Sequence, residues 1–130
     1  MPREVIVPDD RRDTYESLKF APATRAGDMI YLSGIVASYR DGETEADQEA
    51  AIERAFVSID SVLKASGAGW DDIVDVTTYH VDMMSHVGAY TRVKDRWIKQ
   101  PYPSWTAIGV TRLFPERSLV EIKVTAYAPQ

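Results

Sequence analysis

Residues 119–127 read LVEIKVTAY, and residues 102–110 shortly before them read YPSWTAIGV. Both runs alternate between apolar and polar residues, which is typical of β-strands with one buried face. In the later run the apolar residues share one face, and Glu121 lies on the other. Eight residues, Pro115 among them, join the two runs. We therefore predict that the runs pair as antiparallel neighbours in one sheet.

This pairing would bring Glu121 beside the face that carries Trp105 and Ala107. A carboxylate beside an aromatic ring on a rigid sheet is suited to form the wall of a ligand pocket. The alternative for Glu121 is an exposed strand residue paired with Lys123 on the same face, which composition alone favours. Trp105 also has two interpretations. Its ring and indole N–H recognise an aromatic ligand, or it fills a cleft or a subunit interface.

The composition predicts one globular domain spanning residues 1–130. Hydrophobic residues make up 45% of the chain and charged residues 27%, which is ordinary for a soluble domain with a core. The net charge of −5 argues against binding to nucleic acid or to an anionic membrane. The chain has no cysteine, no signal peptide and no window resembling a membrane span, so we expect a cytoplasmic protein.

Apolar periodicity predicts two helices and several strands. Apolar residues three and four positions apart favour helices over residues 52–63 and 87–98. Alternation favours strands at 29–34 and 73–81, and residues 15–24 form a possible strand that Pro22 interrupts. The predicted order is β-β-α-β-α-β-β, an α+β fold with both helices on one face of a mixed sheet.

Four segments, taken in order, carry a family resemblance. They are GDMIYLSG at 27–34, DIVDVTTY at 72–79, YPSWTAIGV at 102–110 and VEIKV at 120–124. The chain resembles the RidA/YjgF family over about residues 15–128, and is most similar to its YjgH-like branch in the last two segments. The resemblance implies a chorismate-mutase-like fold, assembled as a homotrimer with ligand clefts between subunits.

The resemblance also implies an activity. Well-known members hydrolyse reactive enamines and imines to a keto acid and ammonia without a cofactor, so it implies a deaminase acting on C=N bonds. The glutamate that places the water in those members matches Glu121 here. The arginine that binds the substrate carboxylate matches Trp105, which cannot fork onto a carboxylate as a guanidinium does. We therefore expect an altered substrate range, with a neutral or aromatic ligand.

Further family positions can be matched residue by residue. An aromatic residue near the start matches Phe20, a strand-end glycine matches Gly34, and a helix residue from a neighbouring subunit matches Lys94. Family members often carry a second acid where Lys123 stands, and two roles are open for this lysine. It forms an ion pair with Glu121, which we favour, or it replaces the lost arginine. The expected intersubunit cleft is lined by Glu121, Trp105, Ala107, Phe20 and Gly34.

Other functions are less well supported by the sequence. His80 and His86 are the only histidines and lack the spacing of a metal-ligand motif, so we expect no metal. Loss of the family arginine also fits a non-catalytic small-ligand sensor or chaperone-like module, because fold does not dictate function. An endoribonuclease, a label that some relatives carry, is disfavoured because the chain has no basic stripe.

Overall fold

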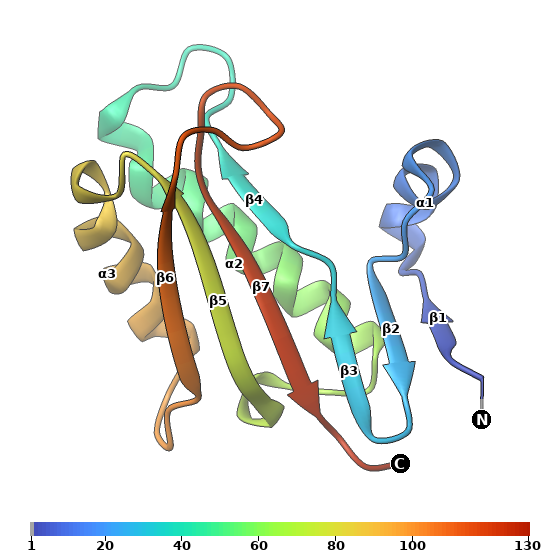
Figure 1. Ribbon diagram of the computed structural model, residues 1–130. Coiled ribbons are helices and arrows are strands. Elements are labelled where there is room, and N and C mark those ends of the chain that lie inside the picture. The colour runs from blue at the N-terminus through green and yellow to red at the C-terminus, as the bar shows by residue number, and fades with distance from the viewer. Residues whose placement is uncertain (1) are drawn as a thin grey trace.

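The computed structural model describes residues 2–130 and is built around a mixed sheet of seven strands (Figure 1). The strands are β1 (Glu4–Ile6), β2 (Ala23–Ala26), β3 (Met29–Leu32), β4 (Ile35–Ser38), β5 (Ile73–Val81), β6 (Ser104–Val110) and β7 (Ser118–Tyr127). The helices are α1 (Arg12–Leu18), α2 (Gln48–Ala65) and α3 (Val87–Trp97). Figure 1 shows α2 and α3 behind one face of the sheet, while the opposite face is uncovered. The predicted α+β class and the two helices on one face are confirmed.

The strand order is β1-β2-β3-β7-β5-β6, and β4 continues beyond β3 along the same side of β7. Both β3 and β4 run antiparallel to β7, with Tyr31 opposite Thr125 and Val36 opposite Glu121. Residues 33–34 lie between the two strands and interrupt the pairing. The long strand β7 is therefore the centre of the sheet, with β5 on its other side.

The predicted pairing of residues 102–110 with residues 119–127 is wrong. β6 pairs only with β5, and the two strands are parallel, with Trp105 opposite Val76. Val76 in turn lies opposite Val124 of β7, so β5 separates the two runs. The helix α3 connects β5 to β6, and such a crossover returns the chain parallel to the strand it left. The loop after β6 then has only to pass the end of β5, about 10 Å of sheet.

The core lies between the sheet and α2, as the predicted helical stripe requires. Ile52, Phe56, Ile59 and Leu63 of α2 are fully buried, as are the facing side chains of β7. The ring of Phe56 stacks on Trp70, with 5.7 Å between ring centroids. Complete burial of one such side chain stabilises the fold by about 1.5–3 kcal/mol. This packing fixes the sheet that carries the candidate site residues.

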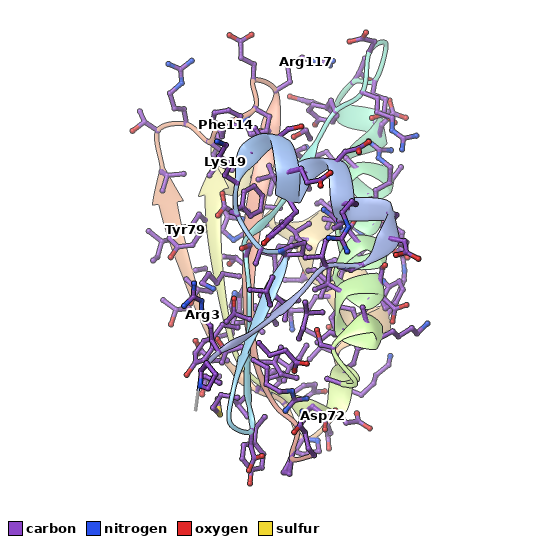
Figure 2. All side chains as sticks on the ribbon, turned by 90° about the vertical axis from the view of Figure 1, so that its right-hand side faces the viewer. Arg3, Lys19, Asp72, Tyr79, Phe114 and Arg117 are labelled. Carbon is purple, nitrogen blue, oxygen red and sulfur yellow. The ribbon has the colours of Figure 1, made fainter. Side chains whose placement is uncertain are left out.

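The structure corrects the prediction for residues 15–24. The first part of this segment belongs to α1, a third helix, and only its last residues form β2. The helix ends at Lys19, which has a left-handed backbone with φ of 61° (Figure 2). None of the residues of α1 is fully buried. The helix therefore lacks the apolar stripe by which helices are recognised in a sequence.

Candidate functional site

Glu121 and Gly34 lie against each other on the sheet. Glu121 belongs to the uncovered face of β7, in a row with Val36 of β4 and Tyr79 of β5. Figure 2 shows Tyr79 on the side of the sheet opposite α2. A Cβ atom added to Gly34 would overlap the carboxylate oxygen Oε2 of Glu121. A side chain at position 34 would therefore have to displace the carboxylate from this position.

Phe20 and Gly34 share a hollow of about 160 Å³. Its walls come from the turn before α1, from α1 itself, from β4 and from α2, and they include Thr14 and Ser58. The Ser33 hydroxyl donates a hydrogen bond of 2.6 Å to the carbonyl of Ala21, next to Phe20. This bond holds the segment after α1 against the junction of β3 and β4. Gly34 thus lies against Glu121 and also lines the hollow that contains Phe20.

Trp105 and Ala107 lie on the other face of the sheet, so the expectation that Glu121 lies near the face carrying them is wrong. Ala107 is opposite Thr78 of β5, and Thr78 is opposite Ile122 of β7. Residues in one such row share a face, whereas successive residues of a strand point to opposite faces. Ala107 therefore shares a face with Ile122 and not with Glu121.

Trp105 lines a second hollow, of about 240 Å³, together with Lys94, Tyr102, Ile98 and Val76. The Lys94 ammonium lies 5.1 Å from the centroid of the Trp105 ring, within the range of a cation–π interaction. The side chain of Lys94 is 17% exposed, and its ion-pair partner is the adjacent Asp95, at 3.9 Å. Lys94 thus combines with Trp105 of its own chain to form an aromatic wall that carries a positive charge.

A chain of buried polar groups holds the Trp105 ring. Its indole N–H donates a hydrogen bond of 2.9 Å to Oγ1 of Thr78. Thr78 Oγ1 lies 2.7 Å from Nε2 of His80, and His80 Nδ1 lies 3.0 Å from Nε2 of His86. Burial, aided by the neighbouring His86, lowers the pKa of His80 to about 4, and burial lowers the pKa of His86 as well. Both imidazoles are therefore neutral near pH 7.

The sequence analysis did not identify Thr78 as a functional neighbour of Trp105. Thr78 and His80 alternate with partly exposed residues along β5 and are both completely buried. Buried polar side chains on the core face of a strand require partners, and here they supply partners to one another. The family resemblance gave no reason to examine this position.

Lys123 does not form the ion pair with Glu121 that we favoured. Among the ion pairs of residues 2–130, none joins these two side chains. The Lys123 ammonium donates instead a hydrogen bond of 2.6 Å to the backbone carbonyl of Leu32. Leu32 is the last residue of β3, where the pairing with β7 is interrupted, so its carbonyl accepts a bond from a side chain instead.

Within residues 2–130 no three His, Asp or Glu side chains lie close enough together to bind a metal ion. None of the helices in this part of the chain has the length and apolar character needed to cross a membrane.

Comparison with known proteins identifies the family. The family model described as endoribonuclease L-PSP matches residues 14–128. The chain is 36% identical over 129 residues to RutC family protein YjgH of Escherichia coli (strain K12), an alignment covering 98% of this chain and 97% of the relative. It matches a solved structure of protein YjgH with a TM-score of 0.84 and 35% identity, covering 100% and 99% of the two chains. The chain therefore belongs to the RidA/YjgF family, as its motifs predicted.

A more distant relative bears the name of an enzyme. The 2-iminobutanoate/2-iminopropanoate deaminase of Dermatophagoides farinae is 29% identical over 107 residues, covering 80% of this chain and 81% of the relative. Its name states a reaction at a C=N bond of a small imino acid.

Proposed function

We propose that this protein hydrolyses the C=N bond of small imines, including those formed when enamines tautomerise, to a carbonyl compound and ammonia. The observation that carries the proposal is the carboxylate of Glu121, which lies against Gly34, one of the residues that line the hollow containing Phe20. The reaction named for the Dermatophagoides farinae relative supports the same chemistry.

In this proposal Glu121 acts as the base. Its carboxylate accepts a proton from water as the water oxygen bonds to the carbon of the C=N group, and the nitrogen takes up a proton. The protonated carboxyl group of Glu121 passes its proton to the amino nitrogen of the resulting carbinolamine. The carboxylate then accepts the hydroxyl proton as the carbon–nitrogen bond breaks, and it returns that proton to solvent. The products are a carbonyl compound and ammonia, and no oxidant, reductant or cofactor is consumed. The contribution of the protein is the position of the carboxylate and of the water beside it.

We further propose that the cleft is completed by a second copy of the chain, in a homotrimer. Glu121 and Trp105 lie on opposite faces of one sheet, so a small ligand that contacts both must lie between two copies. The uncovered face also carries Tyr31, Ile108 and Tyr127, which are 45%, 40% and 49% exposed. Apolar side chains gathered on one face favour association. One copy would supply Glu121, and the next would supply Trp105, Ala107 and Lys94.

A second candidate is a non-catalytic binding module for small ligands. It is favoured by the absence of a guanidinium from the family position on β6, where Trp105 donates its N–H to Thr78. A role as an endoribonuclease is disfavoured by the net charge of −5, since RNA binding depends on a basic surface.

Turnover distinguishes the two candidates. An amino-acid oxidase supplied with different amino acids generates a set of imines in solution, and semicarbazide traps whatever imine survives. We expect the wild-type protein to reduce semicarbazone formation and to accelerate ammonia release, and the variant Glu121→Gln to do neither. If the wild-type protein accelerates none of these hydrolyses yet binds small ligands, the binding module is the correct function.

A further inference from the structure

The turn Asp9–Arg11 places an arginine in the hollow that Phe20 and Gly34 share. Arg11 is the last residue of this turn and directly precedes α1. Its backbone N–H donates a hydrogen bond of 2.9 Å to the carbonyl of Pro8, which fixes the turn. The side chain of Arg11 lines the hollow. A guanidinium therefore lines the same hollow as Gly34, the residue that lies against Glu121, although β6 has no arginine at the family position.

The guanidinium of Arg11 has donor capacity that the described residues leave unused. Its Nε atom is buried and has no hydrogen-bond partner. Arg11 also takes part in none of the ion pairs formed within residues 2–130. Arg25, by contrast, donates to the carbonyls of Ser66 and Ala128, and Arg54 is paired with Glu43. A buried N–H without an acceptor is costly, so a ligand that accepts from it gains affinity.

The hollow suits a small anion with an apolar part. No aspartate or glutamate lines it, so the charge of Arg11 is not cancelled by a carboxylate in its walls. Thr14 and Ser58 add hydroxyl groups, and Phe20 and Val62 add apolar surface. The volume of about 160 Å³ is close to that of a cavity that binds benzene, which corresponds to a ligand of roughly six non-hydrogen atoms. A planar oxyanion matches the fork of a guanidinium.

We propose that Arg11 binds the carboxylate of a small ligand in this hollow, and so takes over the role of the arginine missing from β6. The inference rests on the proposed function in one respect, because it places the ligand beside Gly34 and hence beside Glu121. It changes the expected ligand from a neutral compound to a small carboxylate, whose other end faces the aromatic wall of the neighbouring copy.

Calorimetric titration with two related probes tests this assignment. The probes are 2-oxobutanoate, which is the carbonyl product of 2-iminobutanoate hydrolysis, and its neutral amide. We expect the wild-type protein to prefer the carboxylate, and Arg11→Gln to weaken its binding roughly ten- to a hundredfold while leaving the amide unaffected. The affinity of Arg11→Lys for the carboxylate should lie between those of the wild-type protein and Arg11→Gln, because an ammonium keeps the charge but lacks the forked geometry of a guanidinium.

The neighbouring arginine provides a matched control. Arg12 is exposed, its guanidinium lies 6.0 Å from the centroid of the Tyr15 ring, and it does not line the hollow. Arg12→Gln changes the net charge by the same amount and should leave both affinities unchanged. Equal weakening in the two glutamine variants, or a wild-type protein without preference for the carboxylate, would overturn the assignment. If Arg11→Gln does not fold, the carboxylate affinities of Arg11→Lys and Arg12→Lys are compared instead, and weakening in the first alone supports the assignment while equal affinities overturn it.

The variant Glu121→Gln separates this inference from the proposed function. It should keep the binding of 2-oxobutanoate and its dependence on Arg11 while turnover is lost. Arg11-dependent binding without imine hydrolysis by the wild-type protein would refute the proposed function and support the role of Arg11. Hydrolysis that depends on Glu121, together with carboxylate binding that Arg11→Gln leaves unchanged, would support the proposed function and refute the role of Arg11.

Discussion

The two faces of the sheet hold their candidate residues in different ways. On the uncovered face, Glu121 is placed by the backbone, because its carboxylate occupies the space that a side chain at Gly34 would fill. On the helix-covered face, Trp105 is placed by side chains, through Thr78 and the buried histidines and through the ammonium of Lys94. An atom added at Gly34 should therefore cause a large loss of activity. Substitutions around Trp105, and changes of pH, should cause smaller losses of affinity and stability.

The largest effect should follow from a single methyl group on the uncovered face. In Gly34→Ala the added Cβ overlaps the Glu121 carboxylate and must displace it, so we expect imine hydrolysis to fall by roughly a hundredfold or more. Gly109→Ala is the matched control, because a Cβ there meets no atom within 4 Å. Steady-state kinetics of both variants is the measurement. Equal activity in the two would show that Glu121 is not held by the close contact at Gly34.

Removing the ring on the other face should have the next largest effect. Trp105→Ala eliminates the aromatic wall and the cation–π partner of Lys94, so we expect ligand affinity to fall about tenfold or more. Trp105→Phe keeps a ring beside the ammonium and should retain most of the affinity. Titration of both variants with one ligand compares their affinities. A loss as large in the phenylalanine variant would mean that the indole N–H, and not the ring face, matters for binding.

The buried histidines should make stability depend on pH. His80 is neutral in the folded protein, with a pKa of about 4 against 6.5 in the unfolded chain, so the unfolded state binds more protons between these values. The free energy of unfolding should therefore be highest above pH 6.5 and fall by about 3 kcal/mol as the pH decreases to 4. Urea unfolding at several pH values measures this slope.

The control for this slope is the variant His80→Asn, which cannot take up the proton. Its stability should be lower near pH 7 and should fall less steeply than that of the wild-type protein between pH 6.5 and 4, with the remaining slope due to the buried His86. Asp82 favours the charged form of the neighbouring His86 and so opposes the effect of burial there. A wild-type protein whose stability does not change over this range would contradict the buried, neutral state of His80.

The sequence predicted the helices and strands that have strong periodicity, but it did not predict which strands lie side by side in the sheet. Alternation revealed β5 and β7, and the apolar stripe revealed α2, because both patterns record burial of one face. Alternation cannot say which strand lies beside which, and so residues 102–110 were paired with the wrong strand. The crossover through α3 was the better guide, since β-α-β units in one sheet are parallel. The short helix α1 has no buried residue and gave no pattern.

The sequence predicted part of the candidate site. Gly34 and Glu121, which the family pattern placed together, are in contact, whereas Trp105 was assigned to the wrong face through the mistaken pairing. Arg11 lies in a short polar turn that has no motif, and only its position in the hollow draws attention to it. Thr78 contributes through a hydrogen bond between strands that no linear spacing encodes.

The smallest effect should come from the hydroxyl that anchors the indole. Thr78→Val keeps the shape of the side chain but leaves the Trp105 N–H and the His80 ring without their shared partner. We expect a loss of about 1–3 kcal/mol in stability and less than about tenfold in ligand affinity. Thr77→Val, on the other face of β5, is the control. Unchanged indole N–H chemical shifts in Thr78→Val would show that this bond is not formed in solution.

The central claim is that the two faces meet in one cleft formed by two copies of the chain, and mixing inactive variants tests it directly. As pure proteins, Glu121→Gln is expected to be nearly inactive, and Trp105→Ala is expected to retain about a tenth of the wild-type rate or less at substrate concentrations well below saturation. When the two are unfolded together and refolded as mixed assemblies, roughly a quarter of the clefts should combine an intact Glu121 with an intact Trp105. The account predicts that imine hydrolysis returns to about that fraction of the wild-type rate. Mixed assemblies that stay as inactive as the pure variants would contradict it.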